Sequence, residues 1–370
     1  MTTVGLVGAN GHGKHHRRRI AQLDGVRLIA VADTQPVEPD PPLPDGVRVF
    51  TGHREMLAAA APDVVIICTP PHTHLAIAED ALRAGADVLL EKPPVRTVDE
   101  HHRLMAVLAE TGRACQVGFQ ALGSRAAGLL WDAVAREKVT GIAAVASWQR
   151  DDSYYARAPW AGRRSVGGRA VVDGVLVNPL AHAVMQSLAT AAAAGAGAPV
   201  SVEIERYRTR PIEVDDTAFA RFTFAGGLVL VVAATLAGED FIAGEIIVDG
   251  SAGRAVLEYP TDRLALPGES EPRRVEGRTD LLENLIAHRA AAGVPLLSPL
   301  SRTLTFTAVL AALTDPALPP PVLVEARERD GVRVIPGINA VLRATARTAV
   351  LPSEAAVAWA VPPHRRSLTP

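Results

Sequence analysis

The sequence predicts an α/β protein with two domains. A doubly wound parallel sheet comes first, and an α+β domain with an open, mainly antiparallel sheet follows. Up to about residue 118, short apolar runs alternate with segments of helical spacing. After residue 119, most apolar runs alternate residue by residue, as in half-buried strands. A length of 370 residues suits two domains, which we expect over 1–120 and 121–370, with the last helices as candidates for packing back on the first.

The expected elements of the first domain are short and bounded by turn residues. Strands are expected at 4–7, 26–32, 47–50, 64–68, 88–90 and 114–117. Helices are expected at 14–23, 53–61, 74–84 and 98–111. Strands joined by helical crossovers lie parallel in a doubly wound sheet. The proline-rich segment 36–44 is expected to be a surface loop.

The second domain opens with one expected helix at 124–137 and continues mostly as strands. These are expected at 142–148, 200–208, 217–224, 228–234, 244–248 and 254–259. Gly226 and Gly227 predict a hairpin turn between two of them. Helices are expected again at 281–292, 301–313 and 337–350.

Composition excludes several classes of partner. A formal net charge of -2 gives no electrostatic footprint for nucleic acid or an anionic membrane. The longest apolar stretch, 222–238, alternates like a hairpin rather than a membrane span. Both cysteines lie in apolar runs, and an expected strand starts too early for a signal peptide. We expect a cytoplasmic protein with a small-molecule partner.

A glycine-rich turn follows the first expected strand and precedes the first helix. Gly8 and Gly13 occupy the outer positions of a G-x-G-x-x-G spacing, whereas Asn10 holds the middle and Gly11 follows it. Such a turn lets a dinucleotide pyrophosphate approach the backbone N–H groups at a helix start. Asn tolerates positive φ, so the turn remains possible. A plain tight turn is the alternative.

Asp33 ends the second expected strand. A carboxylate there hydrogen-bonds the adenosine ribose and repels a 2'-phosphate, which favours NAD. The alternative is a solvated loop acid. The run from Arg17 to Arg19 could reach a 2'-phosphate, so NADP stays open.

Two further segments border the same sheet edge. Glu91-Lys92-Pro93-Pro94 ends the fifth expected strand, where Lys92 could stabilise a developing alkoxide or simply be solvated. Its bond to Pro93 is a candidate for the cis form. The loop from Thr69 through Pro70 to His74 ends the fourth strand. His72 and His74 could ligate a metal, but no carboxylate or cysteine completes the set, so a loop or capping role is favoured and no metal is expected. The pairs His15-His16 and His101-His102 are weaker candidates.

Asn178 and His182 are four residues apart at the start of an apolar helix. His182 could be a general base or a packed core histidine. Asn178, followed by Pro179, is favoured as a helix N-cap over a substrate contact.

Aromatic residues are concentrated in one segment of a chain that is only 4% aromatic. Together with neighbouring arginines they suit a sugar ring or a carboxylated sugar. The candidate contacts are Trp148, Tyr154, Arg157, Trp160 and Arg163. The alternative is a mobile loop packed on a neighbouring subunit.

The glycine turn, Asp33, the Thr69 loop, Glu91-Lys92-Pro93, Gly118-Phe119-Gln120 and the approach to His182 occur in an order that resembles the Gfo/Idh/MocA oxidoreductase family. The resemblance implies a Rossmann domain with bound NAD(P), an open-faced mixed sheet, and Lys92 and His182 as catalytic residues. The implied cofactor contacts are Gly8, Asn10, Gly11, His12, Gly13, Asp33, Thr69, Pro70, His74, Glu91 and Gln120.

Two positions depart from the family pattern. Asn178 replaces an aspartate, and a neutral amide cannot take a proton, although we keep Asn178 in the candidate catalytic set. Ala121-Leu122 replaces a polar position after Gln120. The resemblance implies an NAD(P)-dependent dehydrogenase for a secondary alcohol of a sugar, sugar acid or cyclitol, and a homodimer or homotetramer. The alternatives are a lyase, hydrolase or epimerase that uses tightly bound NAD for transient oxidation, and a non-catalytic NAD binder.

Overall fold

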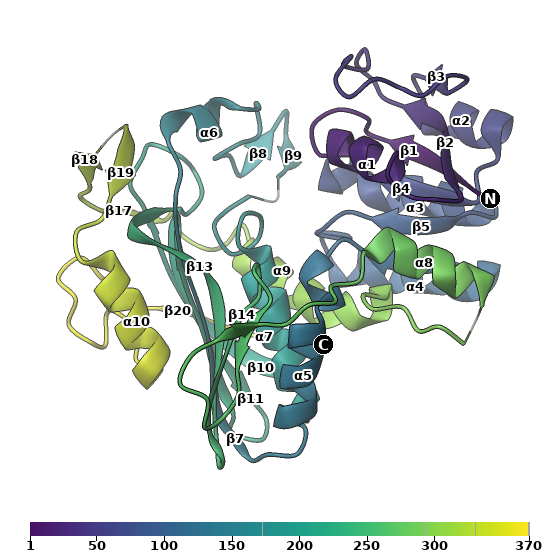
Figure 1. The fold of residues 1–370 in the computed structure, drawn as a ribbon. Helices are drawn as coiled ribbons and strands as arrows, with labels where there is room; N and C mark the ends of the chain where they lie inside the picture. The colour runs from purple at the N-terminus through teal and green to yellow at the C-terminus, as the bar shows by residue number, and fades with distance from the viewer. Residues whose placement is uncertain (172, 292, 330, 369–370) are drawn as a thin grey trace. The chain divides into compact units, whose positions relative to one another are not determined.

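The structure is a computed structural model that describes residues 1–171, 173–291, 293–329 and 331–368. The chain divides into two compact units (Figure 1). The first comprises Met1–Gln120 and Thr279–Thr307, and the second Ala121–Arg278 and Ala308–Pro370.

The first unit is built on a parallel sheet with the strand order β3-β2-β1-β4-β5-β6. Its strands are β1 (Thr2–Val7), β2 (Val26–Ala32), β3 (Arg48–Phe50), β4 (Val64–Ile67), β5 (Asp87–Leu90) and β6 (Cys115–Val117). All its ladders are parallel. The central strand β4 reads VVII and is fully buried, as expected for a strand covered on both faces. The predicted doubly wound sheet is confirmed.

Helices cover the first sheet, and one of them comes from far along the chain. The helices are α1 (Gly13–Ile20), α2 (His53–Ala60), α3 (Pro71–Arg83), α4 (Val98–Thr111) and α8 (Leu281–Ala290), with the 3-10 turn η2 (Leu300–Thr303). Leucines of α8 share one core with β1 and β4. Gln116 of β6 donates to Asn284 of α8 at 2.7 Å and accepts from the N–H of Ser298 at 2.9 Å. The first unit is therefore completed by the segment after residue 278.

The second unit contains a mixed sheet with the order β16-β15-β14-β13-β7-β12-β11-β10-β17, and β20 also pairs with β10. Its strands are β7 (Val139–Gln149), β10 (Pro199–Arg208), β11 (Thr217–Phe224), β12 (Val229–Thr235), β13 (Ala237–Gly250), β14 (Gly253–Glu258), β15 (Arg263–Ala265), β16 (Arg273–Arg274), β17 (Val322–Leu323) and β20 (His364–Ser367). Two ladders, β7 with β12 and β10 with β17, are parallel, and the others are antiparallel. Gly227, with φ of +83°, makes the predicted hairpin between β11 and β12. The mainly antiparallel sheet is confirmed.

Helices lie on both faces of the second sheet (Figure 1). Helices α5 (Arg125–Val134) and α7 (Ala181–Ala193) lie on one face, and α10 (Ile338–Thr348) lies on the other. The remaining elements are the short helix α6 (Asp152–Ala156), α9 (Leu304–Leu313), the 3-10 turn η1 (Gln120–Gly123) and the short ribbons β8–β9 (Ser165–Val166, Arg169–Ala170) and β18–β19 (Arg327–Arg329, Val332–Val334). Ile338 and Leu342 of α10 pack on Tyr207, Phe219 and Val231. Helix α7 packs on β7 and β12 and is adjacent to α5. Among the described residues, no helix is both long and apolar enough to span a bilayer.

Candidate active site

The glycine turn after β1 is sterically restricted at both outer positions. Gly8 has φ of +86°, and a Cβ there would lie 2.8 Å from the carbonyl oxygen of Cys68. A Cβ at Gly13 would lie 2.0 Å from the carbonyl oxygen of Gly8. Gly11 also has positive φ, +51°, but a Cβ there would meet nothing within 4 Å. The turn therefore needs glycine at Gly8 and Gly13 for space, and at Gly11 for backbone conformation.

Asn10 does not adopt positive φ, because Gly11 does so in its place. The role of Asn10 in the turn comes from its side chain. Asn10 Nδ2 donates to the carbonyl of Pro36 at 3.1 Å, and its Oδ1 accepts from the N–H of Glu38 at 2.9 Å. The asparagine thus fastens the turn to the loop that follows β2.

Asp33 lies at the end of β2 and holds the first half of the turn. Its Oδ2 accepts the N–H of Ala9 at 2.9 Å and of Asn10 at 3.2 Å, and its Oδ1 accepts the N–H of Gln35 at 3.0 Å. The carboxylate is thereby fixed at the strand end where its ribose contact is predicted.

The arginines of α1 are engaged with the protein. Arg17 is buried and donates to the carbonyls of Ala9 and Glu38. Arg18 pairs with Asp40 at 2.9 Å. Arg19 pairs with acidic side chains at the start of α8, Asp280 and Glu283.

The loop after β4 is fixed by a buried histidine. Helix α3 begins at Pro71, with Pro70 as its N-cap. His74 lies within 2.7 Å of the Thr69 carbonyl through Nε2 and within 2.9 Å of the Pro93 carbonyl through Nδ1. Burial lowers the pKa of His74, and the hydrogen bonds to the backbone carbonyls of Thr69 and Pro93 act against this. This histidine joins the Thr69 loop to the segment that follows Lys92.

Glu91 contacts three polar side chains at this edge of the sheet. Its Oε1 lies 2.9 Å from His16 Nε2, 3.3 Å from His12 Nε2 and 3.4 Å from Gln120 Nε2. A Cβ at Gly118 would lie 2.7 Å from its Oε2, so that glycine makes room for the carboxylate. Burial opposes ionisation of Glu91, but the hydrogen bonds and charges of His12 and His16 outweigh it and hold its pKa well below the usual range.

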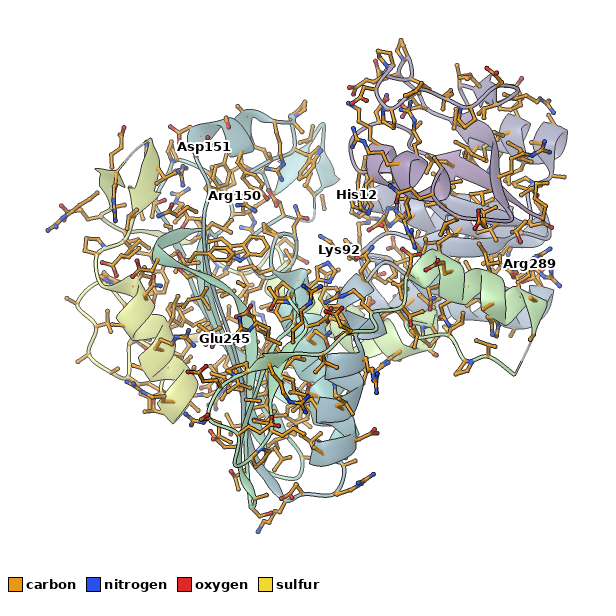
Figure 2. The ribbon with its side chains drawn as sticks, viewed as in Figure 1. His12, Lys92, Arg150, Asp151, Glu245 and Arg289 are labelled. Atoms are coloured by element: carbon orange, nitrogen blue, oxygen red, sulfur yellow. The ribbon has the colours of Figure 1, made fainter. Side chains whose placement is uncertain are left out.

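Lys92 is half-buried directly after Glu91, and its bond to Pro93 is cis. Figure 2 labels Lys92 and His12 on the first unit. The sequence analysis did not predict that His12, His16 and Glu91 form a cluster. It predicted His12 and Glu91 as cofactor contacts and weighed His16 only in the neighbouring pair His15-His16. The four-residue spacing of His12 and His16, with a glutamate ending β5, is the signal that could have revealed it.

In the second unit, the predicted N-cap role of Asn178 is wrong. Helix α7 begins at Ala181 with Leu180 as its N-cap. Asn178 lies in the preceding turn, where Nδ2 donates to Asp173 Oδ1 at 3.0 Å. His182 is half-buried in the first turn of α7. Asp173 was not among the predicted residues, because a partner from a loop carries no periodic signal.

The predicted aromatic segment forms a continuous array of rings and guanidinium groups. Arg150 lies 4.9 Å from the Trp148 ring and 5.2 Å from the Tyr154 ring. Arg157 lies 3.6 Å from the Tyr154 ring and 4.6 Å from the Trp160 ring. Figure 2 places Arg150 where β7 leads into α6. Of the five predicted contacts, Trp148, Tyr154, Arg157 and Trp160 therefore belong to one array.

Arg163, the fifth predicted contact, lies outside this array in the interactions that the structure describes. Its guanidinium pairs with Glu213 at 3.0 Å. The short helix α6 that carries Tyr154 is capped by Asp151, which accepts the Tyr154 N–H at 3.0 Å.

Residues 2–119 match the family model described as "Oxidoreductase family, NAD-binding Rossmann fold". Inositol 2-dehydrogenase of Burkholderia multivorans is 34% identical over 122 residues, which are 31% of this chain and 36% of that protein. An alpha-N-acetylgalactosaminidase of Shewanella oneidensis is 30% identical over 128 residues, 32% of this chain and 28% of that protein. The matched segment spans about a third of these relatives.

The fold extends further than the sequence similarity. The WlbA dehydrogenase of Bordetella pertussis, solved with NADH and UDP-GlcNAcA, superposes with a TM-score of 0.70 over 87% of this chain and 99% of that one, at 22% identity. At this identity the likeness concerns the fold. Residues 2–119 are therefore similar to the NAD-binding Rossmann domain of this oxidoreductase family, and the fold of the chain is similar to that of the WlbA dehydrogenase.

Proposed function

We propose that the chain binds NAD at the carboxyl edge of the first sheet and oxidises a secondary alcohol of a sugar, sugar acid or cyclitol. The observation that carries the proposal is the glycine turn, in which Gly8 and Gly13 leave no space for a side chain. Such a turn brings backbone N–H groups to a pyrophosphate. NAD is favoured over NADP because Asp33 would repel a 2'-phosphate, and the α1 arginines are paired with protein groups.

Two residues would handle the proton of the substrate hydroxyl. Bound NAD supplies the hydride acceptor. The ammonium of Lys92 would hold the hydroxyl oxygen and stabilise it as it becomes an alkoxide. The imidazole of His182 would accept the hydroxyl proton, since its ordinary pKa lies near neutrality. Asn178, oriented by Asp173, would hold a neighbouring hydroxyl through its amide.

The substrate class follows from the array around Tyr154. Arg150 and Arg157 both stack on the Tyr154 ring, and the exposed Arg157 presents a forked donor that suits a carboxylate. The aromatic rings suit a sugar face. We propose a sugar acid as the preferred member of the class.

The test is NADH absorbance on mixing the protein and NAD with sugars, uronic acids and inositols. We expect a signal with at least one compound, and its loss in Lys92→Ala while NAD binding by calorimetry is retained. An equal signal in Lys92→Ala would contradict the assigned role of the lysine. NAD binding without NADH from any compound would refute the dehydrogenase.

The second candidate function is a non-redox reaction on tightly bound NAD. It is favoured by the neutral amide of Asn178 beside a buried carboxylate, and by the similarity to the Shewanella glycosidase. If this second function holds, NAD should copurify with the protein. The protein should then release sugar from a nitrophenyl glycoside without accumulating NADH. A non-catalytic binder would give neither sugar release nor NADH.

We further propose a cytoplasmic homodimer or homotetramer that associates through the sheet of the second unit. Cys68 and Cys115 are both free, which fits a reducing compartment. Light scattering on the purified protein tests the assembly, and a monomer at micromolar concentration would refute it.

A further inference from the structure

Three potential metal ligands converge beside the glycine turn of the first unit. His12 directly precedes α1, and His16 lies one turn along that helix. Both imidazole Nε2 atoms point to the same carboxylate oxygen, Glu91 Oε1, at 3.3 Å and 2.9 Å. The three ligand atoms all lie within 4.8 Å of one another. Among the described residues, this is the one such cluster of three or more histidine, cysteine or acidic side chains.

The two nitrogen–oxygen separations are close to those of ligands that share one ion. Imidazole nitrogen and carboxylate oxygen bind Zn²⁺ at about 2.0–2.2 Å. At angles of about 90–110°, two such ligands lie roughly 3.0–3.4 Å apart. The distance of 3.3 Å from His12 falls inside this interval, and the distance of 2.9 Å from His16 lies just below it.

An ordinary hydrogen bond to Glu91 accounts for the position of His16 but not for that of His12. His16 and Glu91 have side chains only 7% and 11% exposed, and their pairing fastens α1 to the end of β5. His12 is different, because its side chain is 54% exposed and yet approaches the same oxygen. An exposed imidazole has water as an alternative partner, so the helix does not need this contact. The exposed side also gives an ion a path to the cluster.

The carboxylate has the supporting contacts that ordered metal ligands usually have. Gln120 Nε2 donates to Glu91 Oε1 at 3.4 Å, and the N–H of Lys92 donates to Oε2 at 3.3 Å. Two imidazoles and one carboxylate form the donor set of zinc sites that keep an open coordination position.

We propose that His12, His16 and Glu91 form a three-ligand site for a divalent transition metal, with Zn²⁺ as the ion that this set suits best. The ion would add positive charge beside the glycine turn. The proposal rests on these three side chains and not on the proposed dehydrogenase activity.

The experiment is calorimetric titration of the full chain, treated with chelator and without nucleotide, with Zn²⁺. Co²⁺ then reports the ligands through its visible absorption. We expect one ion per chain, and an affinity at least about tenfold lower in His12→Ala. His12 is exposed, so this variant should fold, and its melting temperature checks that. The matched control is His15→Ala, which removes an exposed histidine stacked on His12 at 5.4 Å and leaves the three ligands in place.

Loss of affinity in His12→Ala with retention in His15→Ala supports the site. Unchanged Zn²⁺ affinity in His12→Ala would overturn the proposal, as would equal losses in both variants, which would indicate a histidine-rich surface. Glu91→Gln is the second test, because it keeps the size of the side chain and removes the anionic ligand. The titrations contain no NAD, so their failure is separate from any failure of the proposed oxidoreductase function.

Discussion

Asn178 donates its side-chain amide to the buried carboxylate of Asp173, with 3.0 Å between Nδ2 and Oδ1. The second oxygen of Asp173 accepts the N–H of Gly162 at 2.7 Å. A carboxylate is thus one hydrogen bond away from the position where the family commonly has its aspartate. An amide is the partner that this carboxylate accepts without charge repulsion.

Replacing the amide by a carboxylate should therefore cost stability and gain no activity. Asn178→Asp would bring two acidic groups within hydrogen-bond distance, at a cost of about 1–3 kcal/mol in the free energy of unfolding. Urea unfolding at pH 7 measures this loss. The exchanged double variant Asp173→Asn, Asn178→Asp keeps one amide and one carboxylate and should recover most of it. Additive losses in the double variant would contradict the pairing.

Alanine at Gly13 should remove nucleotide binding. The new Cβ would lie 2.0 Å from the Gly8 carbonyl oxygen, so the turn must open. We expect at least about a tenfold weaker NAD affinity by calorimetry, together with a lower melting temperature. Gly52→Ala is the control, because Gly52 has an extended backbone and nothing within 4 Å of its Cβ position. Comparable NAD affinity in the two variants would be incompatible with a phosphate-binding turn.

The buried acid Asp215 should make stability depend on pH. Burial raises the pKa of Asp215 to about 6, although Arg206, 3.9 Å away, acts against this. Between pH of about 4 and 6 the folded state keeps a proton that the unfolded chain has lost, so the free energy of unfolding falls as pH rises through this window. Above it, the ionised group costs on the order of 3 kcal/mol.

Asp215→Asn removes this ionisation and preserves an acceptor for the N–H of Val175. Relative to the parent protein, the variant should therefore gain stability at pH 8 and show little gain at pH 4. Chemical unfolding at the two pH values decides the matter. A gain of equal size at both would show that ionisation of Asp215 is not the cause.

Loss of the Arg157 guanidinium should raise KM for negatively charged substrates more than for neutral ones. Arg157→Met keeps much of the contact with the Tyr154 ring and removes the forked donor. If the proposed function holds, KM for a uronic acid should rise about tenfold with kcat within about twofold, and KM for an inositol should hardly change. Arg254→Met is the control, since Arg254 is exposed on β14 and pairs with Asp249. Equal effects on both substrates would exclude carboxylate recognition by Arg157.

The sequence was most informative where local chemistry decides the structure. The six strands of the first sheet were predicted within about two residues at each end, because each apolar run is bounded by turn residues. The need for glycine at Gly8 and Gly13 could also be predicted, because only glycine fits where backbone atoms approach so closely.

Long-range contacts were not predictable from local sequence. The start of α7 at Ala181 was missed, because Asn178 bonds Asp173 and not the helix N-terminus. The short helix α6 was also missed, since five residues give no helical periodicity. Strand β13 extends well beyond the predicted 244–248, because its irregular pairing with β7 breaks the alternation.

The place of α8 in the first unit bears on how the protein is synthesised. Leu281, Leu282 and Leu285 belong to the same apolar core as β1 and β4, although about 160 residues separate them from β6 in the chain. As the polypeptide leaves the ribosome, this core lacks the leucines of α8, and part of its apolar surface stays uncovered until the segment beyond residue 278 has been translated. During that interval, the exposed surface is a natural target for holding chaperones. The boundary of the family similarity at residue 119 is therefore not the boundary at which folding of this unit can finish.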